Sequence, residues 1–132
     1  MGLQNGTLMD GATITVNGGT LKTLSVDGQQ VVGGIHLQDS SVSDYRTRPN
    51  ATAKVKLPSL GSDGYYGKGK KSFSLVHPKV LANGKQGFPL IRIELEDYPE
   101  MTQAEVDKLL VWATQILCDA DFLTFWRTGS LA

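Results

Sequence analysis

Basic and hydroxyl side chains occupy alternate positions of three predicted strands. Because neighbouring residues of a strand point to opposite faces, residues two apart share one face. One face of the predicted sheet would then present Lys54, Lys56, Lys70, Ser72, Ser74, Arg92 and Glu94. Lysine and arginine neutralise phosphates, while hydroxyl groups and arginine hydrogen-bond to bases and riboses. We therefore predict a nucleic-acid-binding face, although each residue taken alone fits an ordinary solvent-exposed strand equally well or better.

The distribution of charge supports this hypothesis. The chain has a net charge of zero, but the segment from Arg46 to Lys85 contains nine lysines or arginines and one acid, Asp63. The segments before and after it are acidic. A block this basic is typical of a surface that binds a polyanion, and phosphate is the usual one. A solvated, charged sheet face remains the alternative.

Residue types that perform catalysis are present but are not arranged for it. His36 and His77 fall on separate predicted strands, and no nucleophile-elbow, zinc-protease or dinucleotide-binding motif occurs. The Gly67 to Lys71 segment lacks the glycine spacing of a phosphate loop. Glu94 and Glu96 share a strand face without a third ligand type, which favours a solvated edge. We predict no enzymatic activity, no cofactor and no metal site, and an enzyme using these carboxylates or His77 is the least supported hypothesis.

The length of the chain and its cysteine content limit the classes of protein to which it can belong. A chain of 132 residues predicts one domain with a modest core. The single Cys118 excludes an internal disulfide and is typical of a small buried residue. No apolar run reaches the ~18 residues of a membrane span, so we expect no membrane partner. The N-terminus lacks the pattern of a signal peptide, and the chain fits a cytosolic, reducing compartment.

The N-terminal segment predicts a β-hairpin. Ala12 to Val16 and Thr20 to Val26 alternate apolar and polar residues on either side of Asn17-Gly18-Gly19. Asn-Gly between two such runs is a strong hairpin signal because both central residues need a positive φ. Asp27-Gly28 predicts a second turn, and Gln30 to Leu37 predicts the next strand.

The middle of the chain predicts an antiparallel sheet. Gly33-Gly34 indicates a bulge or bend in the strand just described. Ala51 to Leu57, Lys70 to His77 and Phe88 to Glu96 then alternate apolar and polar residues, as strands with one covered face do. The glycine-rich loop from Ser59 to Gly69 carries two tyrosines that could stack on an unpaired base, with surface decoration as the alternative.

The C-terminal third predicts two helices. Thr102 and Glu105 form a capping box, and Asp119 or Asp121 can cap a second helix that ends at Gly129. One apolar stripe follows from the spacing of Val106, Leu109, Leu110, Ala113, Ile116 and Leu117. The aromatic residues Trp112, Phe122, Phe125 and Trp126 add more apolar surface than one sheet face requires. We infer that part of this tail packs on a partner subunit, with ordinary core as the alternative.

This order of elements resembles the coat proteins of single-stranded RNA bacteriophages, the leviviruses. The resemblance covers essentially the whole chain. Its most specific parts are Gly87-Phe88-Pro89-Leu90-Ile91-Arg92-Ile93-Glu94 and the tail from Pro99 to Ala132, which ends in Asp119-Ala120-Asp121-Phe122-Leu123-Thr124-Phe125-Trp126-Arg127-Thr128-Gly129-Ser130-Leu131-Ala132. The match lies in pattern and layout, without a short diagnostic motif.

The resemblance implies an α+β fold in a single coat-protein domain over residues 1–132. Residues 1–28 would form the N-terminal β-hairpin, 29–98 a five-stranded antiparallel sheet, and 99–132 a dimerisation tail of two C-terminal α-helices. Two subunits would interlock as a dimer with a continuous ten-stranded sheet. The interface would comprise Leu109, Leu110, Ala113, Leu117, Phe122, Phe125 and Trp126.

The resemblance also implies partners and a function. Dimers would assemble into an icosahedral shell in the cytoplasm of the bacterial host and would package genomic RNA in the virion. In the family the polar sheet face can also bind an RNA stem-loop and repress replicase translation; here Lys54 and Lys56, Ser72 and Ser74, and Arg92 and Glu94 would carry over, strand by strand. The loop at the symmetry axes would comprise Ala82, Asn83, Gly84, Lys85, Gln86 and Gly87. The alternative is a stand-alone dimeric RNA-binding regulator that forms no shell.

Overall fold

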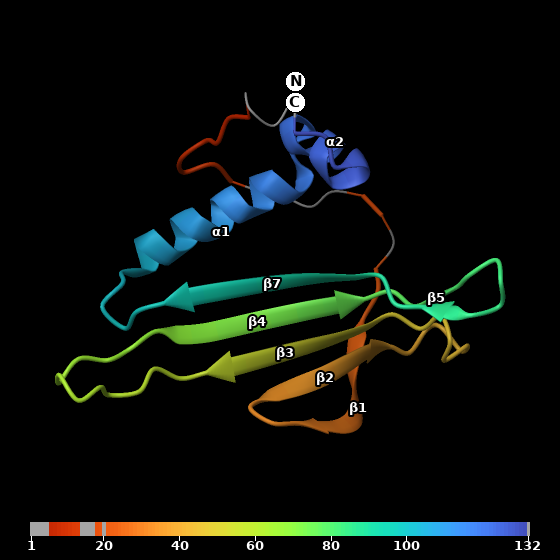
Figure 1. Ribbon diagram of the computed structural model, residues 1–132, viewed down its shortest axis with the longest axis horizontal. Helices are drawn as coiled ribbons and strands as arrows, with labels where there is room; N and C mark the ends of the chain where they lie inside the picture. Colours follow the sequence, from red (N-terminus) through yellow and green to blue (C-terminus); the bar gives the residue numbers. More distant parts are fainter. Residues whose placement is uncertain (1–5, 14–17, 20, 132) are drawn as a thin grey trace. The chain divides into compact units, whose positions relative to one another are not determined.

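The computed structural model describes residues 6–13, 18–19 and 21–131 of the chain. The chain divides into two compact units (Figure 1). One unit, Gly19–Pro99, contains the strands, and the other joins Met1–Gly18 to Glu100–Ala132 and contains the helices. Each unit has its own hydrogen-bonded framework, and the strand unit carries the candidate site.

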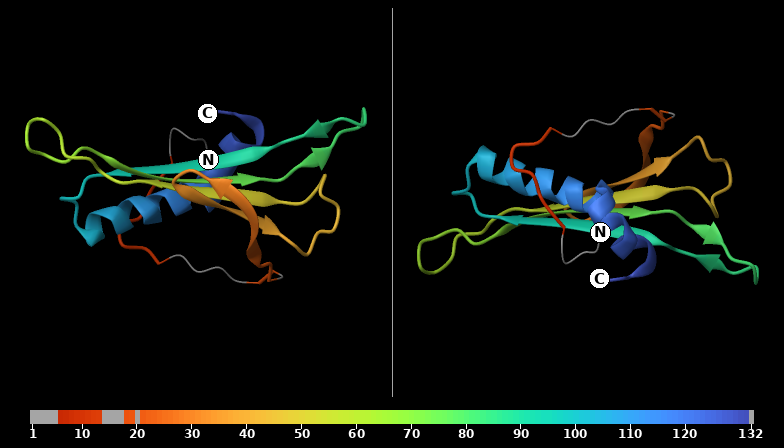
Figure 2. Two further views of the ribbon diagram at one scale, coloured as in Figure 1. Left: turned by 90° about the horizontal axis from the view of Figure 1, so that it is seen from below. Right: turned by 90° about the horizontal axis from the view of Figure 1, so that it is seen from above.

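The strand unit is built on a five-stranded antiparallel sheet, which confirms the predicted architecture. Its strands, in spatial order, are β1 (Leu24–Val31), β2 (Gly34–Asp39), β3 (Asn50–Lys56), β4 (Gly69–Val76) and β7 (Leu90–Asp97). A small hairpin of β5 (Lys79–Val80) and β6 (Gln86–Gly87) is inserted between β4 and β7. This hairpin and the β3–β4 loop extend from opposite ends of the sheet (Figure 2).

Cross-strand register confirms the predicted alternation of faces. Thr52 lies opposite Ser74, which lies opposite Arg92. One residue further along, Ala53 lies opposite Phe73, and Phe73 lies opposite Ile93. Residues directly opposite each other point to the same face, so polar and apolar rows alternate across β3, β4 and β7. The sheet therefore has one polar face and one apolar face.

The predicted positions of a turn and a bulge were wrong, because the structure exchanges them. Asp27-Gly28 does not end a strand; it lies within β1, where the register with β2 shifts between Val26 and Gln30. The tight turn is Val32-Gly33, where Gly33 has a φ of 73°. Both places need a glycine with positive φ, so residue type alone could not distinguish the bulge from the turn.

Gly34, the first residue of β2, is required by close backbone packing. A Cβ atom there would collide with the carbonyl oxygen of Ala53 on β3. We expect Gly34→Ala to lower the free energy of unfolding by roughly 1–3 kcal/mol, as overpacked sites do. Urea unfolding followed by circular dichroism would measure this loss. The control is Gly67→Ala, because a Cβ there meets nothing closer than 3.8 Å; equal losses in both variants would contradict the steric explanation.

The last three predicted strands each end differently in the structure. Leu57 follows β3, His77 follows β4, and Phe88 and Pro89 precede β7 and are not part of it. Proline has no N–H to donate to a neighbouring strand, although the Pro89 carbonyl still accepts a bond from the His77 amide at 3.0 Å. In the predicted loop 82–87, Gln86 belongs to β6, as does Gly87.

The helical unit contains the two predicted helices, α1 (Gln103–Cys118) and α2 (Ala120–Thr128). The Thr102–Glu105 capping box is present, and Asp119 caps the start of α2. Gly129 ends α2 in the left-handed conformation at φ 75°. Among the described residues no single helix is long and apolar enough to span a membrane; only α1 and α2 together, across a bend of 62°, reach that length and composition.

Gln115 attaches the N-terminal segment to α1. The Met9 amide donates to Gln115 Oε1 at 2.8 Å, and Gln115 Nε2 donates to the Met9 carbonyl at 2.9 Å. Trp112 Nε1 also donates to Asp10 Oδ1 at 3.0 Å. No sequence pattern indicated this attachment, because a glutamine at position 115 is unremarkable on a helix. Of the predicted N-terminal hairpin, residues 14–17 and 20 lie outside the described residues, whereas Leu24 to Val26 belong to β1 and pair with β2.

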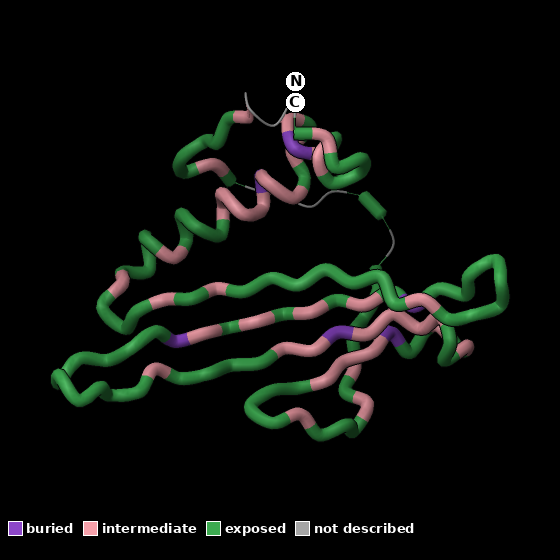
Figure 3. The backbone as a smooth tube through the Cα atoms, viewed as in Figure 1, coloured by how far each residue is buried: buried purple, intermediate pink, exposed green. Residues whose placement is uncertain are grey.

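The chain on its own has a small core. Among the described residues, Ala51, Pro78 and Phe122 are the buried apolar side chains, and Figure 3 shows how little of the chain is buried. Large apolar side chains stay exposed on the apolar sheet face, including Phe73, Leu75, Ile91 and Ile93. Monomeric proteins rarely expose this much contiguous apolar surface, so the isolated chain has the surface of an associating subunit.

Candidate nucleic-acid interface

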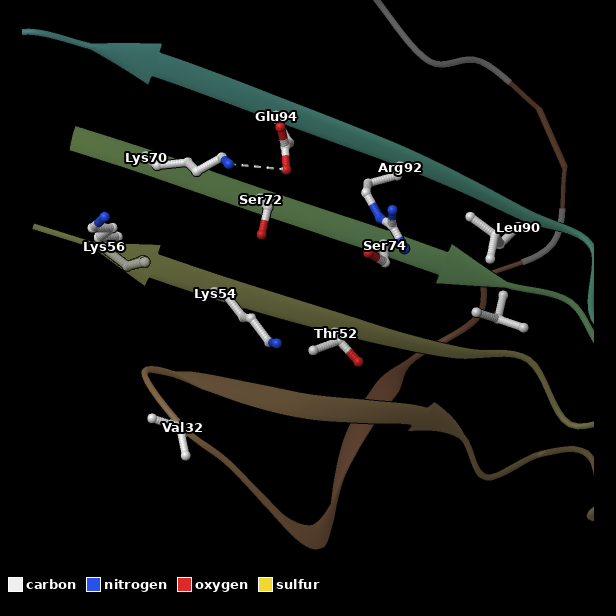
Figure 4. Close-up of a pocket in the computed structure, with 12 residues that line it drawn as sticks. Val32, Thr52, Lys54, Lys56, Lys70, Ser72, Ser74, Leu90, Arg92 and Glu94 are labelled. Atoms are coloured by element: carbon white, nitrogen blue, oxygen red, sulfur yellow. Dashed lines mark ion pairs between the residues drawn. The ribbon is translucent and has the colours of Figure 1, made fainter. Parts of the chain in front are cut away.

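The polar face of β3, β4 and β7 brings the predicted binding residues together. Figure 4 shows the side chains rising from three adjacent strands on the same side of the sheet. They line one open concavity of about 560 Å³. The predicted residues in its lining are Lys54, Lys56, Lys70, Ser72, Ser74, Arg92 and Glu94. The sequence therefore predicted the placement of all seven, while their role in binding stays a prediction.

Positive charge prevails in this concavity. Its lining holds four cationic side chains against one carboxylate, that of Glu94. Lys70 Nζ lies 3.5 Å from Glu94 Oε1, the ion pair drawn in Figure 4. Among the described residues, Lys54, Lys56 and Arg92 form no ion pair. Those three cations can therefore neutralise phosphates without first giving up a protein partner.

Further residues of the concavity were not among the predicted site residues. Thr52 adds a third hydroxyl beside Ser72 and Ser74, and the alternation of β3 already indicated its face. Val32 lies at the β1–β2 turn and is 99% exposed, so it adds apolar surface at one margin. Val32 was not predicted because the turn itself was misplaced.

A histidine–carboxylate pair stabilises the sheet beside this concavity. His36 Nδ1 lies 2.5 Å from Asp27 Oδ2, which joins β2 to the bulge of β1. The backbone amide of Gln29 is the main cause that lowers the pKa of the Asp27 carboxyl, and His36 lowers it further. His36 lies opposite Thr52 in the sheet register, so the pair supports the β2 side of the polar face.

The acidic residues and Cys118 show no catalytic arrangement. Glu96 Oε2 lies 3.4 Å from Lys68 Nζ, so both carboxylates of the strand face pair with lysines. Cys118 is exposed, contrary to the expectation of a buried thiol. In the described ranges, no group of three or more histidine, cysteine or acidic side chains could hold a metal ion.

The predicted dimer-interface residues occupy both helices. Leu109, Leu110 and Trp126 are exposed in the single chain. Ala113 and Leu117 on α1 and Phe125 on α2 are partly exposed. Phe122 differs from the others, since it is 7% exposed and already packs within its own chain. Six of the seven side chains therefore retain surface that a second subunit could cover.

The predicted symmetry-axis loop is the tip of the β5–β6 hairpin. The Leu81 amide donates to the Lys85 carbonyl at 2.8 Å, and Gly84 turns the chain at φ 81°. Ala82 and Asn83 complete the turn, and the Asn83 side chain accepts a bond from the Lys85 amide at 3.0 Å. Gln86 Nε2 donates to the Arg46 carbonyl at 2.9 Å, which connects this hairpin to the β2–β3 loop.

Subunits in solved structures of virus-like particles share this fold. The subunit of the virus-like particle of bacteriophage GQ-907 is 37% identical, with a TM-score of 0.93 over 98% of this chain and 99% of that one. The particle of Beihai levi-like virus 21 gives a TM-score of 0.66 at 16% identity over 95% and 97% of the two chains. That of Wenzhou levi-like virus 4 gives 0.62 at 15% over 93% and 86%. The last two likenesses concern the fold alone.

The relationship is visible through structure and not through sequence profiles. No protein-family model matches the chain, and no curated protein matches it. The near-complete coverage and 37% identity to the GQ-907 subunit nevertheless establish the family. Its members are structural proteins and not enzymes. The chain belongs to the coat proteins of the single-stranded RNA bacteriophages, the leviviruses.

Proposed function

We propose that this chain is the major coat protein of an RNA phage, and that it assembles as dimers into an icosahedral shell around genomic RNA. The observation that carries the proposal is the cationic, hydroxyl-bearing face of β3, β4 and β7 in a chain of this family. The shell is a virion component, and its assembly takes place in the cytoplasm of the bacterial host.

Dimer formation is supported by the exposed apolar surface of the single chain. A continuous ten-stranded sheet requires pairing along an edge strand, and β1 and β7 are the edges of the sheet. Paired edges no longer present free N–H and C=O groups to other chains. The exposed Leu109, Leu110 and Trp126 would become covered when the helices of two subunits interlock. The whole chain then acts as one coat-protein domain.

RNA binding is supported by the chemistry of the polar face. The unpaired Lys54, Lys56 and Arg92 suit phosphates, while the hydroxyls of Ser72 and Ser74 suit riboses and base edges. The same groups could recognise an RNA stem-loop at the replicase start and so repress translation. The loop 82–87 would lie at the symmetry axes, where its Asn-Gly pair permits more than one conformation.

Electron microscopy of the recombinant protein, with the 260/280 nm absorbance ratio of the same fraction, tests this function. We expect uniform spherical particles whose absorbance is dominated by nucleic acid. A dimer that binds RNA without forming particles would favour the stand-alone regulator instead. A monomer without RNA would contradict both functions.

A further inference from the structure

We propose that the β3–β4 loop is a docking hairpin between copies of this chain, and that Tyr65 of one copy fills an apolar pocket at the base of the same hairpin in a neighbouring copy. The docking hairpin comprises residues 59–67. The inference rests on the proposed assembly into a shell, since a shell needs contacts between dimers in addition to the contact within each dimer.

The docking hairpin is an ordered projection and not a loose connection. Leu60 and Tyr66 form an isolated antiparallel bridge. The Gly61 amide donates to the Tyr65 carbonyl at 2.8 Å, and the Gly67 amide donates to the Ser59 carbonyl at 2.9 Å. A segment with a fixed shape loses little conformational entropy on docking. The hairpin projects beyond the end of the sheet (Figures 1 and 2), where a neighbouring molecule can reach it.

The projection exposes aromatic side chains that its own chain does not use. Tyr65 is 69% exposed and Tyr66 is 56% exposed, and Leu60 beside them is 62% exposed. Tyrosine is enriched in the centres of protein interfaces, because one side chain combines a large apolar ring with a hydroxyl. Two exposed tyrosines and one exposed leucine on a nine-residue hairpin give it the composition of an interface anchor.

The pocket at the base of the docking hairpin fits one aromatic ring. Its volume is about 180 Å³, and its walls include Leu57, Pro58, Tyr98 and Pro99. Benzene occupies an apolar cavity of roughly 150 Å³ in another protein, so the size is adequate for a phenol ring. Lysines and Asp97 also line the pocket and offer partners for the tyrosine hydroxyl. The lining does not include Tyr65 itself.

Charge favours a protein occupant over RNA. The docking hairpin carries one charged residue, Asp63, and it is negative. Lys68, just after the hairpin, lies 3.4 Å from Glu96 and 5.9 Å from the centre of the Tyr98 ring. A tip without free cations would not neutralise phosphates, whereas RNA-stacking surfaces combine aromatic rings with basic grooves. A second copy of the chain offers a pocket for the exposed Tyr65 and a tyrosine for the open pocket.

Tyr65→Ser tests the contact, with Tyr45→Ser as the matched control because Tyr45 is 78% exposed in a different loop. We expect Tyr65→Ser to remain a folded dimer but to yield about tenfold fewer particles, because aromatic anchors dominate interface energies. Tyr45→Ser should assemble as the parent protein does. Normal assembly of Tyr65→Ser would overturn the proposal, and normal particles with less RNA would assign Tyr65 to base stacking instead.

Cross-linking tests the same contact without relying on loss of assembly. In a Cys118→Ser background that keeps Tyr65 and Tyr98, Ser62→Cys on the docking hairpin combined with Lys71→Cys at the pocket should form disulfides between copies in oxidised particles. The same protein dissociated into dimers before oxidation should form none. Particles that show no such cross-link would overturn the docking contact while the shell stands. Failure of the parent protein to form any particle would instead overturn the proposed function, and the docking contact with it.

Discussion

Trp126→Ala is expected to eliminate soluble dimers, and particles with them. The Trp126 ring is 48% exposed in the single chain and lies among the apolar residues proposed to meet a second subunit. Truncation of a large aromatic side chain that becomes buried costs roughly 3–5 kcal/mol. A symmetric dimer contains the residue twice, so the loss is a large fraction of the 5–15 kcal/mol that typically stabilises a domain. Size-exclusion chromatography with light scattering would measure the loss.

Trp126 also has a role within its own chain, which a second variant separates from dimerisation. Its Nε1 donates to the Ile116 carbonyl at 2.7 Å, one of the carbonyls that the end of α1 leaves without a helical partner. Trp126→Phe removes this bond but keeps an apolar ring, so we expect it to dimerise. Val32→Ala, at a turn of the strand unit, should have no effect on dimerisation. A stable, folded monomer of Trp126→Ala would refute a core shared between subunits.

Periodicity predicted those parts of the fold where side-chain pattern and backbone agree. The alternation around Thr52, Ser72 and Arg92 fixed both the strands and the face on which these residues lie, since a shift of one residue would have buried the charges. The capping box of Thr102 and Glu105 likewise placed the start of α1. Local chemistry specifies these features almost completely.

Features that depend on distant parts of the chain were not predictable. Gly28 and Gly33 both adopt positive φ, and pairing with β3 decides that the second one makes the turn. Gln115 holds Met9, which is more than one hundred residues away in sequence, so no short-range pattern identifies it. The pocket beside the docking hairpin brings Leu57 near Tyr98 through the pairing of β3, β4 and β7. The turn, the Gln115–Met9 contact and the pocket all form between residues that are brought together only when the sheet or the helix has folded.

Reversal of charge on the polar face of β3, β4 and β7 is expected to have a second large effect, on RNA packaging. Lys54→Glu combined with Lys56→Glu should deplete packaged RNA while dimers persist. Both lysines lie on the polar face, and neither forms an ion pair in the described part of the chain. The change replaces two cations with two anions in each subunit, so phosphates that were attracted would be repelled. Each lost contact to a single strand should lower the salt dependence of binding, log K against log salt concentration, by roughly 0.7.

The matched control places the same change of charge on other surfaces of the sheet unit. Lys68 precedes β4 and Lys79 lies on β5, and neither lines the polar-face concavity or the pocket at the base of the docking hairpin. Lys79 is exposed, and Lys68 forms an exposed ion pair with Glu96 that contributes little to stability. Lys68→Glu with Lys79→Glu should therefore retain RNA if the location of charge matters and its total does not. Equal RNA loss in both double variants would show that net charge alone governs packaging. Unchanged RNA content in Lys54→Glu/Lys56→Glu would show that the polar face does not bind RNA.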